Sequence, residues 1–227
     1  MMATMPQDPA SPAREFYRAH LRESFIHTGL FAASVQRIAE EVVDKPEFDA
    51  ITGEAPQGAL DAARRIGELA IVHLDGAPNP PGPWWRDLCN YDRGVFMQRA
   101  TTDPGPPTNR PRRGVSALCA TFNWNMPEIV ARLRSGEAIN EDLRRPITLL
   151  FARTAEGKVH IVEVGSAVEK VFRATNGLRT VEQVASTADV PLTDTQQILN
   201  ALGGIGAVVL GKSAEEIMRV LREQGKA

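Results

Sequence analysis

The chain has 227 residues, of which 43% are hydrophobic and 24% are charged, and its formal net charge is −2 at pH 7. This composition is typical of a globular protein with one large or two small domains, and it argues against wholesale disorder. The near-neutral charge gives no reason to expect a polyanionic partner. The two cysteines, Cys89 and Cys119, belong to no CxxC pair, so neither a zinc site nor a disulfide framework is supported.

The start of the sequence has neither the basic nor the apolar region of a signal peptide. The longest apolar runs, such as residues 69–74 and 147–152, are far too short to span a bilayer. We therefore expect a cytoplasmic protein that has no membrane partner.

The first hundred residues have the apolar spacings of amphipathic helices. Pro46 is predicted to end the second helix, and the proline-rich segment 103–111 is interpreted as a linker. The predicted helices span residues 13–27, 30–43, 57–73 and 84–100. This half is thus expected to form a small helical bundle.

Beyond the linker, apolar residues alternate with polar ones in short runs, which indicates strands. The predicted elements are a strand at 115–124, a short helix at 127–133, a hairpin of strands 147–153 and 158–164, and helices at 166–175, 180–187 and 193–202. Capping boxes begin at Thr180, Thr193 and Ser213, the last of which would open a terminal helix.

These elements predict an α+β protein with two parts. Residues 1–103 form a helical bundle, residues 104–114 form the linker, and residues 115–227 form a winged-helix-like domain. That domain is expected to contain a three-stranded antiparallel sheet plus three helices.

Residues that could carry catalysis are scattered along the sequence. His20 and His27 would lie about 10 Å apart on one helix, which is too far for both to bind one metal ion. No Gly-x-Ser-x-Gly motif occurs, and neither cysteine has a local catalytic signature. The glycine-rich run 203–206 follows a helix and lacks a Lys-Ser/Thr pair, so a turn is expected there. We predict no catalytic residue, no metal ligand and no cofactor in this chain.

Winged helices often bind DNA, and this possibility has to be weighed. The helix at 193–202, which would be the recognition helix, contains no Arg or Lys. Residues 165–210 hold three basic and four acidic residues, a net charge of −1. DNA affinity rests largely on neutralising phosphates, so nucleic acid is not an expected partner. The basic residues Arg110, Arg112 and Arg113 are interpreted as part of a solvated linker.

A winged helix without a basic face still offers a sheet edge, where an extended peptide can pair with free backbone groups. We predict that the strand 158–164 is this edge and that the helix 193–202 is the second wall of a groove. The alternative, that the strand is covered within the chain and is only structural, stays open. The predicted peptide-binding residues are Val159, His160, Ile161, Val162 and Glu163 on the strand, and Gln197, Asn200 and Ala201 on the helix.

The segment 163–185, with its motif Arg179-Thr-Val-Glu-Gln-Val-Ala185, and the segment 196–210 resemble PqqD-type recognition elements for precursor peptides. In that family a helix ends in a glycine-containing turn, and two further helices and a short apolar end follow. The resemblance implies a domain that binds the leader of a ribosomally made precursor peptide.

A second resemblance covers more of the chain. The motifs Trp84-Trp-Arg-Asp-Leu-Cys-Asn-Tyr-Asp92, Phe96-Met-Gln-Arg-Ala-Thr-Thr102 and Arg144-Arg-Pro-Ile-Thr-Leu-Leu-Phe151 are similar to the partner subunits of multinuclear iron peptide-modifying oxidases. That group includes the methanobactin oxazolone synthase and the enzyme of the 3-thiaglutamate pathway. The resemblance implies a heterodimer with a TIM-barrel subunit, which supplies the iron and acts on a peptide cysteine.

On this resemblance, the expected interface with the oxidase consists of Trp84, Trp85, Arg86, Tyr91 and Phe96. Adjacent residues of a helix point about 100° apart, so one of the two tryptophans is expected to be partly exposed. The alternative is that both close the top of the helical bundle. Arg86 and Asp92 would lie either at the rim of an interface or in a buried pair.

Two rival functions stay open. A winged-helix transcription regulator would need phosphate contacts, which the charge count opposes. A free-standing hydrolase would need a nucleophile and a base in one pocket, which a single sequence neither supplies nor excludes. The reading we carry forward is a non-catalytic accessory subunit that presents a peptide to an iron oxidase.

Overall fold

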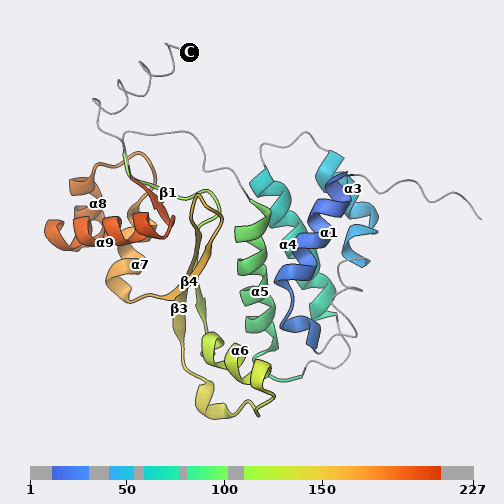
Figure 1. Ribbon diagram of the computed structural model, residues 1–227. Coiled ribbons are helices and arrows are strands. Elements are labelled where there is room, and N and C mark those ends of the chain that lie inside the picture. Colours follow the sequence, from blue (N-terminus) through green and yellow to red (C-terminus); the bar gives the residue numbers. More distant parts are fainter. Residues whose placement is uncertain (1–11, 31–40, 54–58, 77–80, 102–109, 211–227) are drawn as a thin grey trace, which may run out of the picture. The chain divides into compact units, whose positions relative to one another are not determined.

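The computed structural model describes residues 12–30, 41–53, 59–76, 81–101 and 110–210 (Figure 1). The chain divides into two compact units, Met1–Ala100 and Thr101–Ala227. In the described residues, a helical region precedes a small three-stranded antiparallel sheet with helices after it, which confirms the predicted α+β class. Within these ranges, no helix is both long and apolar enough to cross a lipid bilayer.

The first unit is helical in its described residues, and its long helices α4 and α5 pack against each other while α1 packs against α5. Its fully buried side chains include Leu21, Phe25, Ile66 and Phe96. Each such side chain stabilises the fold by about 1.5–3 kcal/mol. The elements are α1 (Pro12–Ser24), the 3-10 helix η1 (Thr28–Leu30), α3 (Pro46–Gly53), α4 (Ala59–Asp75) and α5 (Trp85–Ala100).

Pro46 begins helix α3 instead of only ending the helix before it, so the sequence analysis missed this element. Proline fits the first helical position because its missing N–H has no partner there and its φ is already helical. Most of the predicted helix 30–43 lies outside the described residues, although residues 41–43 are helical.

The second unit contains the sheet and the helices that cover one of its faces. Strands β2, β3 and β4 pair antiparallel in that order, with Leu149 opposite both Ala120 and Glu163. The elements are β1 (Arg112–Arg113), β2 (Leu118–Phe122), α6 (Met126–Ser135), η2 (Glu141–Leu143), β3 (Ile147–Arg153), β4 (Val159–Glu163), α7 (Ser166–Ala174), α8 (Val181–Ala188), α9 (Leu192–Gly204) and β5 (Val208–Val209).

The central strand β3 is almost entirely buried, as a strand with neighbours on both sides should be. Every second side chain of β3 faces α7, α8 and α9, and these residues form the core of the winged-helix part. The core cluster consists of Leu150, Ala152, Val171, Phe172, Ala174, Val184, Ala188, Leu199, Leu202, Ala207 and Val208.

The helix starts agree only partly with the sequence. The Thr180 side chain accepts from the Gln183 N–H, and the Gln183 side chain accepts in turn from the Thr180 N–H, so this capping box is confirmed. The box predicted at Thr193 is wrong, because α9 begins one residue earlier with Pro191 in the capping position. The box predicted at Ser213 lies outside the described residues.

The predicted linker 104–114 is too long at its C-terminal end. Strand β1 pairs with β5, with Arg112 opposite Val209, so these residues belong to the folded second unit. The Gly177 N–H donates to the Pro111 carbonyl (2.9 Å), and the Arg110 guanidinium donates to the carbonyl of Leu178. Two-residue strands so far apart in sequence leave no periodic signal, so Arg112 and Arg113 were predicted to belong to a solvated linker.

Candidate functional site

Strand β4 lies at the edge of the sheet, and the described residues place no strand on its far side (Figure 1). At one end of the hairpin the Val164 N–H donates to the Thr148 carbonyl (2.9 Å), and at the other end the Thr154 N–H donates to the Lys158 carbonyl (3.0 Å). Antiparallel ladders alternate, so the even-numbered residues from 158 to 164 direct their backbone groups toward β3.

The same alternation gives the free edge. The N–H and C=O groups of Val159, Ile161 and Glu163 point away from β3, the direction from which another strand would add. Their spacing of two residues matches the repeat of an extended peptide. The predicted edge therefore has a definite pattern, with three donors and three acceptors.

The side chains of β4 alternate between the two faces of the sheet. Ile161 lies opposite Phe151, whereas His160 and Val162 lie opposite Ala152 and Leu150 on the face that packs against the helices. Val162 is 39% exposed, which is unusual for a valine beside a core. This strand thus combines free backbone groups with an accessible apolar side chain.

Glu163 ends this edge in an ion pair. Its carboxylate lies 3.3 Å from the Arg145 guanidinium, and both side chains are about half exposed. Exposed pairs of this kind contribute about 0–1 kcal/mol to stability. Both charges therefore remain available to a ligand that pairs along β4.

Helix α9 carries the residues that were predicted to form the second wall of the groove. Gln197, Asn200 and Ala201 are all exposed, but only Asn200 lines the pocket next to the hairpin. Gln197, Ala201 and the residues of β4 lie outside that pocket. The structure thus places Asn200 beside the hairpin turn, and the role of Gln197 and Ala201 in a groove along β4 stays a prediction.

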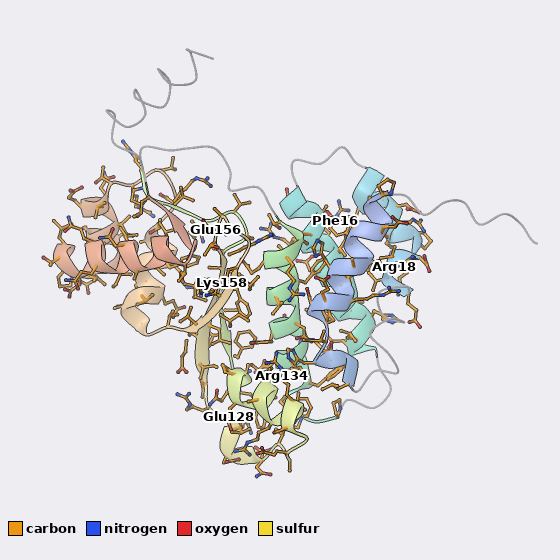
Figure 2. All side chains as sticks on the ribbon, in the orientation of Figure 1. Phe16, Arg18, Glu128, Arg134, Glu156 and Lys158 are labelled. Carbon is orange, nitrogen blue, oxygen red and sulfur yellow. The ribbon has the colours of Figure 1, made fainter. Side chains whose placement is uncertain are left out.

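This pocket has a volume of about 650 Å³ and lies at the hairpin end of the sheet. Figure 2 marks Glu156 and Lys158 in the turn between β3 and β4, on the border of this region. In the sequence, only the glycine run 203–206 marks part of this pocket. Its walls are Thr101, Gly114, Val115, Ser116, Arg153, Thr154, Ala155, Glu156, Asn200, Gly203, Gly204, Gly206, Val208, Val209 and Leu210.

Two glycines allow these walls to meet. A Cβ on Gly114 would lie 2.5 Å from the Gly206 carbonyl oxygen, and a Cβ on Gly206 would lie 2.1 Å from that of Arg153. Gly206 also has a φ of 76°, in the left-handed region that favours glycine. The turn after α9 can therefore approach β1 and the hairpin only because both positions lack side chains.

The charges in the pocket are balanced. The Arg153 guanidinium donates to the Thr101 carbonyl (3.3 Å). A hydrogen bond from the Thr154 side chain and one from its own backbone lower the pKa of Glu156, which therefore stays ionised at neutral pH. One positive and one negative side chain leave the pocket without net charge.

Two of the basic residues near the helices, Arg113 and Arg173, are engaged within the fold. The Arg113 guanidinium lies over the ring of Phe172, 5.8 Å from its centroid, and Arg173 pairs with Glu169 at 2.9 Å. The exposed face of α9 carries Asp194 and no basic residue. This surface is a poor match for a phosphate backbone.

Most of the residues on and beside helix α5 that were predicted to contact the oxidase are buried within this chain. Trp84, Trp85, Tyr91 and Phe96 are all at most 7% exposed, and only Arg86 is exposed. The expectation of one exposed tryptophan is wrong because Trp84 precedes the helix, so the 100° rotation between helical neighbours does not apply. The indole of Trp85 donates to the Leu74 carbonyl at 3.5 Å.

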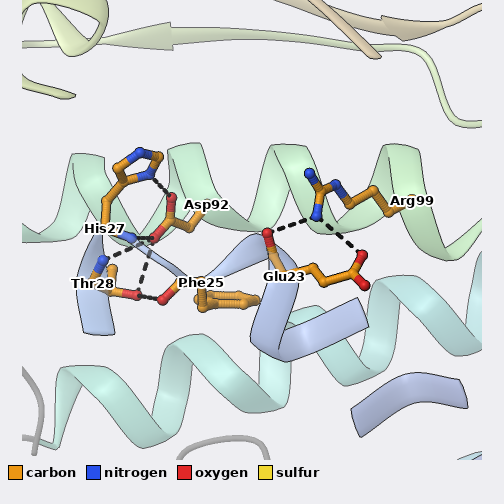
Figure 3. Close-up of polar contacts among 6 residues, drawn as sticks. All are labelled: Glu23, Phe25, His27, Thr28, Asp92 and Arg99. Carbon is orange, nitrogen blue, oxygen red and sulfur yellow. Dashed lines mark hydrogen bonds and ion pairs between the residues drawn. The ribbon is translucent and has the colours of Figure 1, made fainter. Parts of the chain in front are cut away.

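Asp92 occupies a buried network at the centre of α5 (Figure 3). Its Oδ2 accepts from the N–H of Thr28 (2.9 Å), the N–H of His27 (3.2 Å) and the Thr28 hydroxyl (3.1 Å). Its Oδ1 lies 2.7 Å from Nδ1 of His27. The carboxylate thus caps the start of η1 from another helix, and Asp92 belongs to a buried pair.

Neither cysteine has the environment of a nucleophile. Burial raises the pKa of the Cys119 thiol to about 11, with a further rise from Glu169 and a smaller opposing effect from Arg173. Burial, together with the carboxylates of Asp75 and Asp92, raises the pKa of Cys89 even further. Both thiols are therefore protonated at neutral pH, in the unreactive form.

In the ranges the structure describes, no three His, Cys, Asp or Glu side chains converge to hold a metal ion. Comparison of the sequence with known protein families and with curated proteins found no match. The functional reading therefore rests on the geometry of β4, α9 and the hairpin pocket, together with the sequence resemblances.

Proposed function

We propose that this chain is a non-catalytic subunit that binds the leader of a ribosomally made precursor peptide and presents it to an iron-dependent oxidase. The observation that carries the proposal is the edge position of β4, where no described strand pairs with the outward backbone groups of Val159, Ile161 and Glu163. The proposed mode of binding is addition of one strand to the sheet.

Backbone pairing alone would bind such a peptide weakly. Each hydrogen bond contributes about 0.5–1.5 kcal/mol net, and six of them are available along the edge. Ordering a disordered segment costs about 2–5 kcal/mol, which offsets much of that gain. Side-chain burial has to supply the rest, and Val162, which is 39% exposed, offers apolar surface on the same strand.

The proposed contribution to the reaction is recruitment. A leader held on this subunit keeps the rest of the peptide near the partner's iron site at an effective concentration in the mM range. The support for an oxidase as partner is the similarity of the motifs at 84–92, 96–102 and 144–151 to subunits of such enzymes. In this proposal the iron and all redox chemistry belong to the partner.

The docking surface for the oxidase is assigned to the helical unit as a whole. Trp84, Trp85, Tyr91 and Phe96 are buried in this chain and serve its own core, so they do not carry the proposal. Arg86 remains accessible, because its side chain is 78% exposed and its ion pair with Asp75 is long, at 3.9 Å.

A proline at the edge tests the strand-addition mode. Ile161→Pro removes the central outward N–H while the bonds from β4 to β3 remain, because proline is tolerated on an edge whose N–H faces solvent. Ile161→Val keeps the N–H and is the matched control. The probe is a fluorescein-labelled peptide with the leader sequence of the precursor encoded beside this gene, followed by fluorescence anisotropy.

We expect Ile161→Pro to weaken binding of the peptide at least 10-fold, which corresponds to roughly 1.4 kcal/mol of binding free energy. Ile161→Val should change the affinity by less than about threefold. Circular dichroism must report the wild-type fold for both variants. Equal affinities for the two folded variants would rule out pairing along β4. Binding of random duplex DNA at low salt, with no binding of the peptide, would favour the regulator instead.

A further inference from the structure

A peptide on an edge strand has a problem of register. The free groups of β4 repeat every two residues, so a shift of the peptide by two residues restores almost the same hydrogen bonds. Val159, Ile161 and Glu163 therefore cannot by themselves decide which peptide residues lie opposite them. A specific complex needs a side-chain contact at a fixed point, as in other strand-addition complexes.

The hairpin pocket lies within reach of this edge. Glu156 lines the pocket and Val159 begins β4, only three residues further along the chain. Three residues span at most roughly 11 Å, so a peptide that continues past Val159 reaches the pocket within two or three residues. The described part of the second unit thus has a cavity at the end of the proposed binding strand.

The chemistry of the pocket suits an apolar residue and its flanking backbone. Val115, Val209 and Leu210 supply apolar surface, and Leu210 is 40% exposed although it is a large hydrophobic side chain. The exposed amide of Asn200 offers a donor and an acceptor, which match a peptide unit. Arg153 and Glu156 cancel in charge, so a charged side chain gains no net attraction.

The wall formed by α9 is open at one position. A Cβ on Gly204 would meet no heavy atom within 4 Å, although this residue lines the pocket. By contrast, a Cβ on Gly203 would lie 3.1 Å from Cδ1 of Leu210. A side chain at position 204 can therefore project into free space at the pocket without disturbing the helix.

We infer that the hairpin pocket is an anchor site for an apolar side chain of the same leader peptide, two or three residues beyond the segment that pairs with β4. This inference rests on the proposed function and adds to it the element that sets the register. The ligand class is a neutral apolar residue in an extended chain, with its backbone contacted by Asn200.

Obstruction of the pocket gives a direct test. Gly204→Leu fills it from a position with no clash, and Gln196→Leu is the matched control, an added leucine on the exposed face of the same helix outside the pocket. The labelled leader peptide and a set of its single-alanine variants are titrated against full-length wild type, Gly204→Leu, Gln196→Leu and Ile161→Pro.

We expect Gly204→Leu to weaken binding of the leader about 10-fold and Gln196→Leu to leave it unchanged. We also expect one apolar leader residue whose replacement by alanine weakens binding about 10-fold to the wild type but less than twofold to Gly204→Leu. Such coupling is the signature of direct contact.

The outcomes separate the two proposals. Normal affinity of folded Gly204→Leu, together with loss of binding in Ile161→Pro, would overturn the anchor and leave strand addition in place. The anchor would also be overturned if every alanine variant of the peptide lost the same fold of affinity for Gly204→Leu as for the wild type. Failure of the wild type to bind the leader would overturn both the proposed function and the anchor.

Discussion

Replacement of Asp92 tests a fully buried polar contact of the helical unit. Asp92→Ala leaves the N–H groups of His27 and Thr28, the Thr28 hydroxyl and the His27 ring without their acceptor. The hydroxyl keeps a second acceptor, the Phe25 carbonyl at 3.1 Å, whereas the two backbone N–H groups and the His27 ring lose their hydrogen bonds to Asp92. Each unsatisfied buried group costs about 1–3 kcal/mol, and such costs are not additive, so a total of about 3–5 kcal/mol is expected.

Asp92→Asn separates charge from hydrogen bonding. The amide oxygen can replace Oδ2, and the amide nitrogen can donate to Nδ1 of His27 in one of its neutral tautomers. We expect this variant to cost about 1–2 kcal/mol, because only the charge-assisted part of the bonds is lost. Asp61→Asn is the control, since Asp61 is 54% exposed and pairs only loosely with Arg64 at 3.5 Å.

Urea unfolding of the full chain, followed by tryptophan fluorescence, measures these differences. With a slope of about 1.5 kcal/mol per molar urea, a loss of 3 kcal/mol lowers the midpoint by about 2 M. The expected order of midpoints is Asp61→Asn close to wild type, then Asp92→Asn, then Asp92→Ala. An Asp92→Ala midpoint within 0.3 M of wild type, or Asn as costly as Ala, would refute the argument from buried acceptors.

The other predictions concern the second unit. Gly204→Ala should stabilise this unit by about 0.5–1 kcal/mol through helix propensity. Gly206→Ala should destabilise it by more than about 2 kcal/mol, because the new Cβ would overlap the Arg153 carbonyl. Equal melting temperatures for the two variants would contradict this geometry. Thr180→Ala should cost about 1 kcal/mol in thermal unfolding while Thr180→Ser costs less, because serine keeps the cap. Burial raises the pKa of the Cys119 thiol from 9.0 to about 11, so at pH 9 this thiol should react with iodoacetamide ~50-fold more slowly in the folded than in the denatured chain. The free energy of unfolding should fall as the pH rises from about 9 to about 11, because the denatured chain loses the thiol proton first. Equal reaction rates in the two states would contradict the burial of Cys119.

The sequence predicted those elements whose residues interact with near neighbours along the chain. The strand Ile147–Arg153 was placed with its observed bounds, because alternation and a glycine-containing turn define a hairpin strongly. The helix after Thr180 was placed by its capping box, which involves only four consecutive residues. The position of β4 at the sheet edge was predicted from the order of the hairpin and the helices along the chain.

The features that the sequence did not reveal depend on residues far apart. Strands β1 and β5 are short and separated by almost a hundred residues, so neither carries a period. The partners of Asp92 lie 64 and 65 residues away, and no spacing rule connects them. The pocket is likewise assembled from several segments, and only Asn200 of the predicted helix residues lines it.

We propose that this chain is the peptide-binding subunit of an iron oxidase. The most direct test is co-expression with the iron-enzyme gene nearest to it, with an affinity tag on this chain only, followed by measurement of subunit ratio and bound iron in the eluate. We expect a stable one-to-one complex that contains iron and modifies the precursor peptide, whereas neither subunit does so alone. Elution of this chain by itself, or modification of the peptide by the oxidase alone at the same rate, would rule out the proposed role.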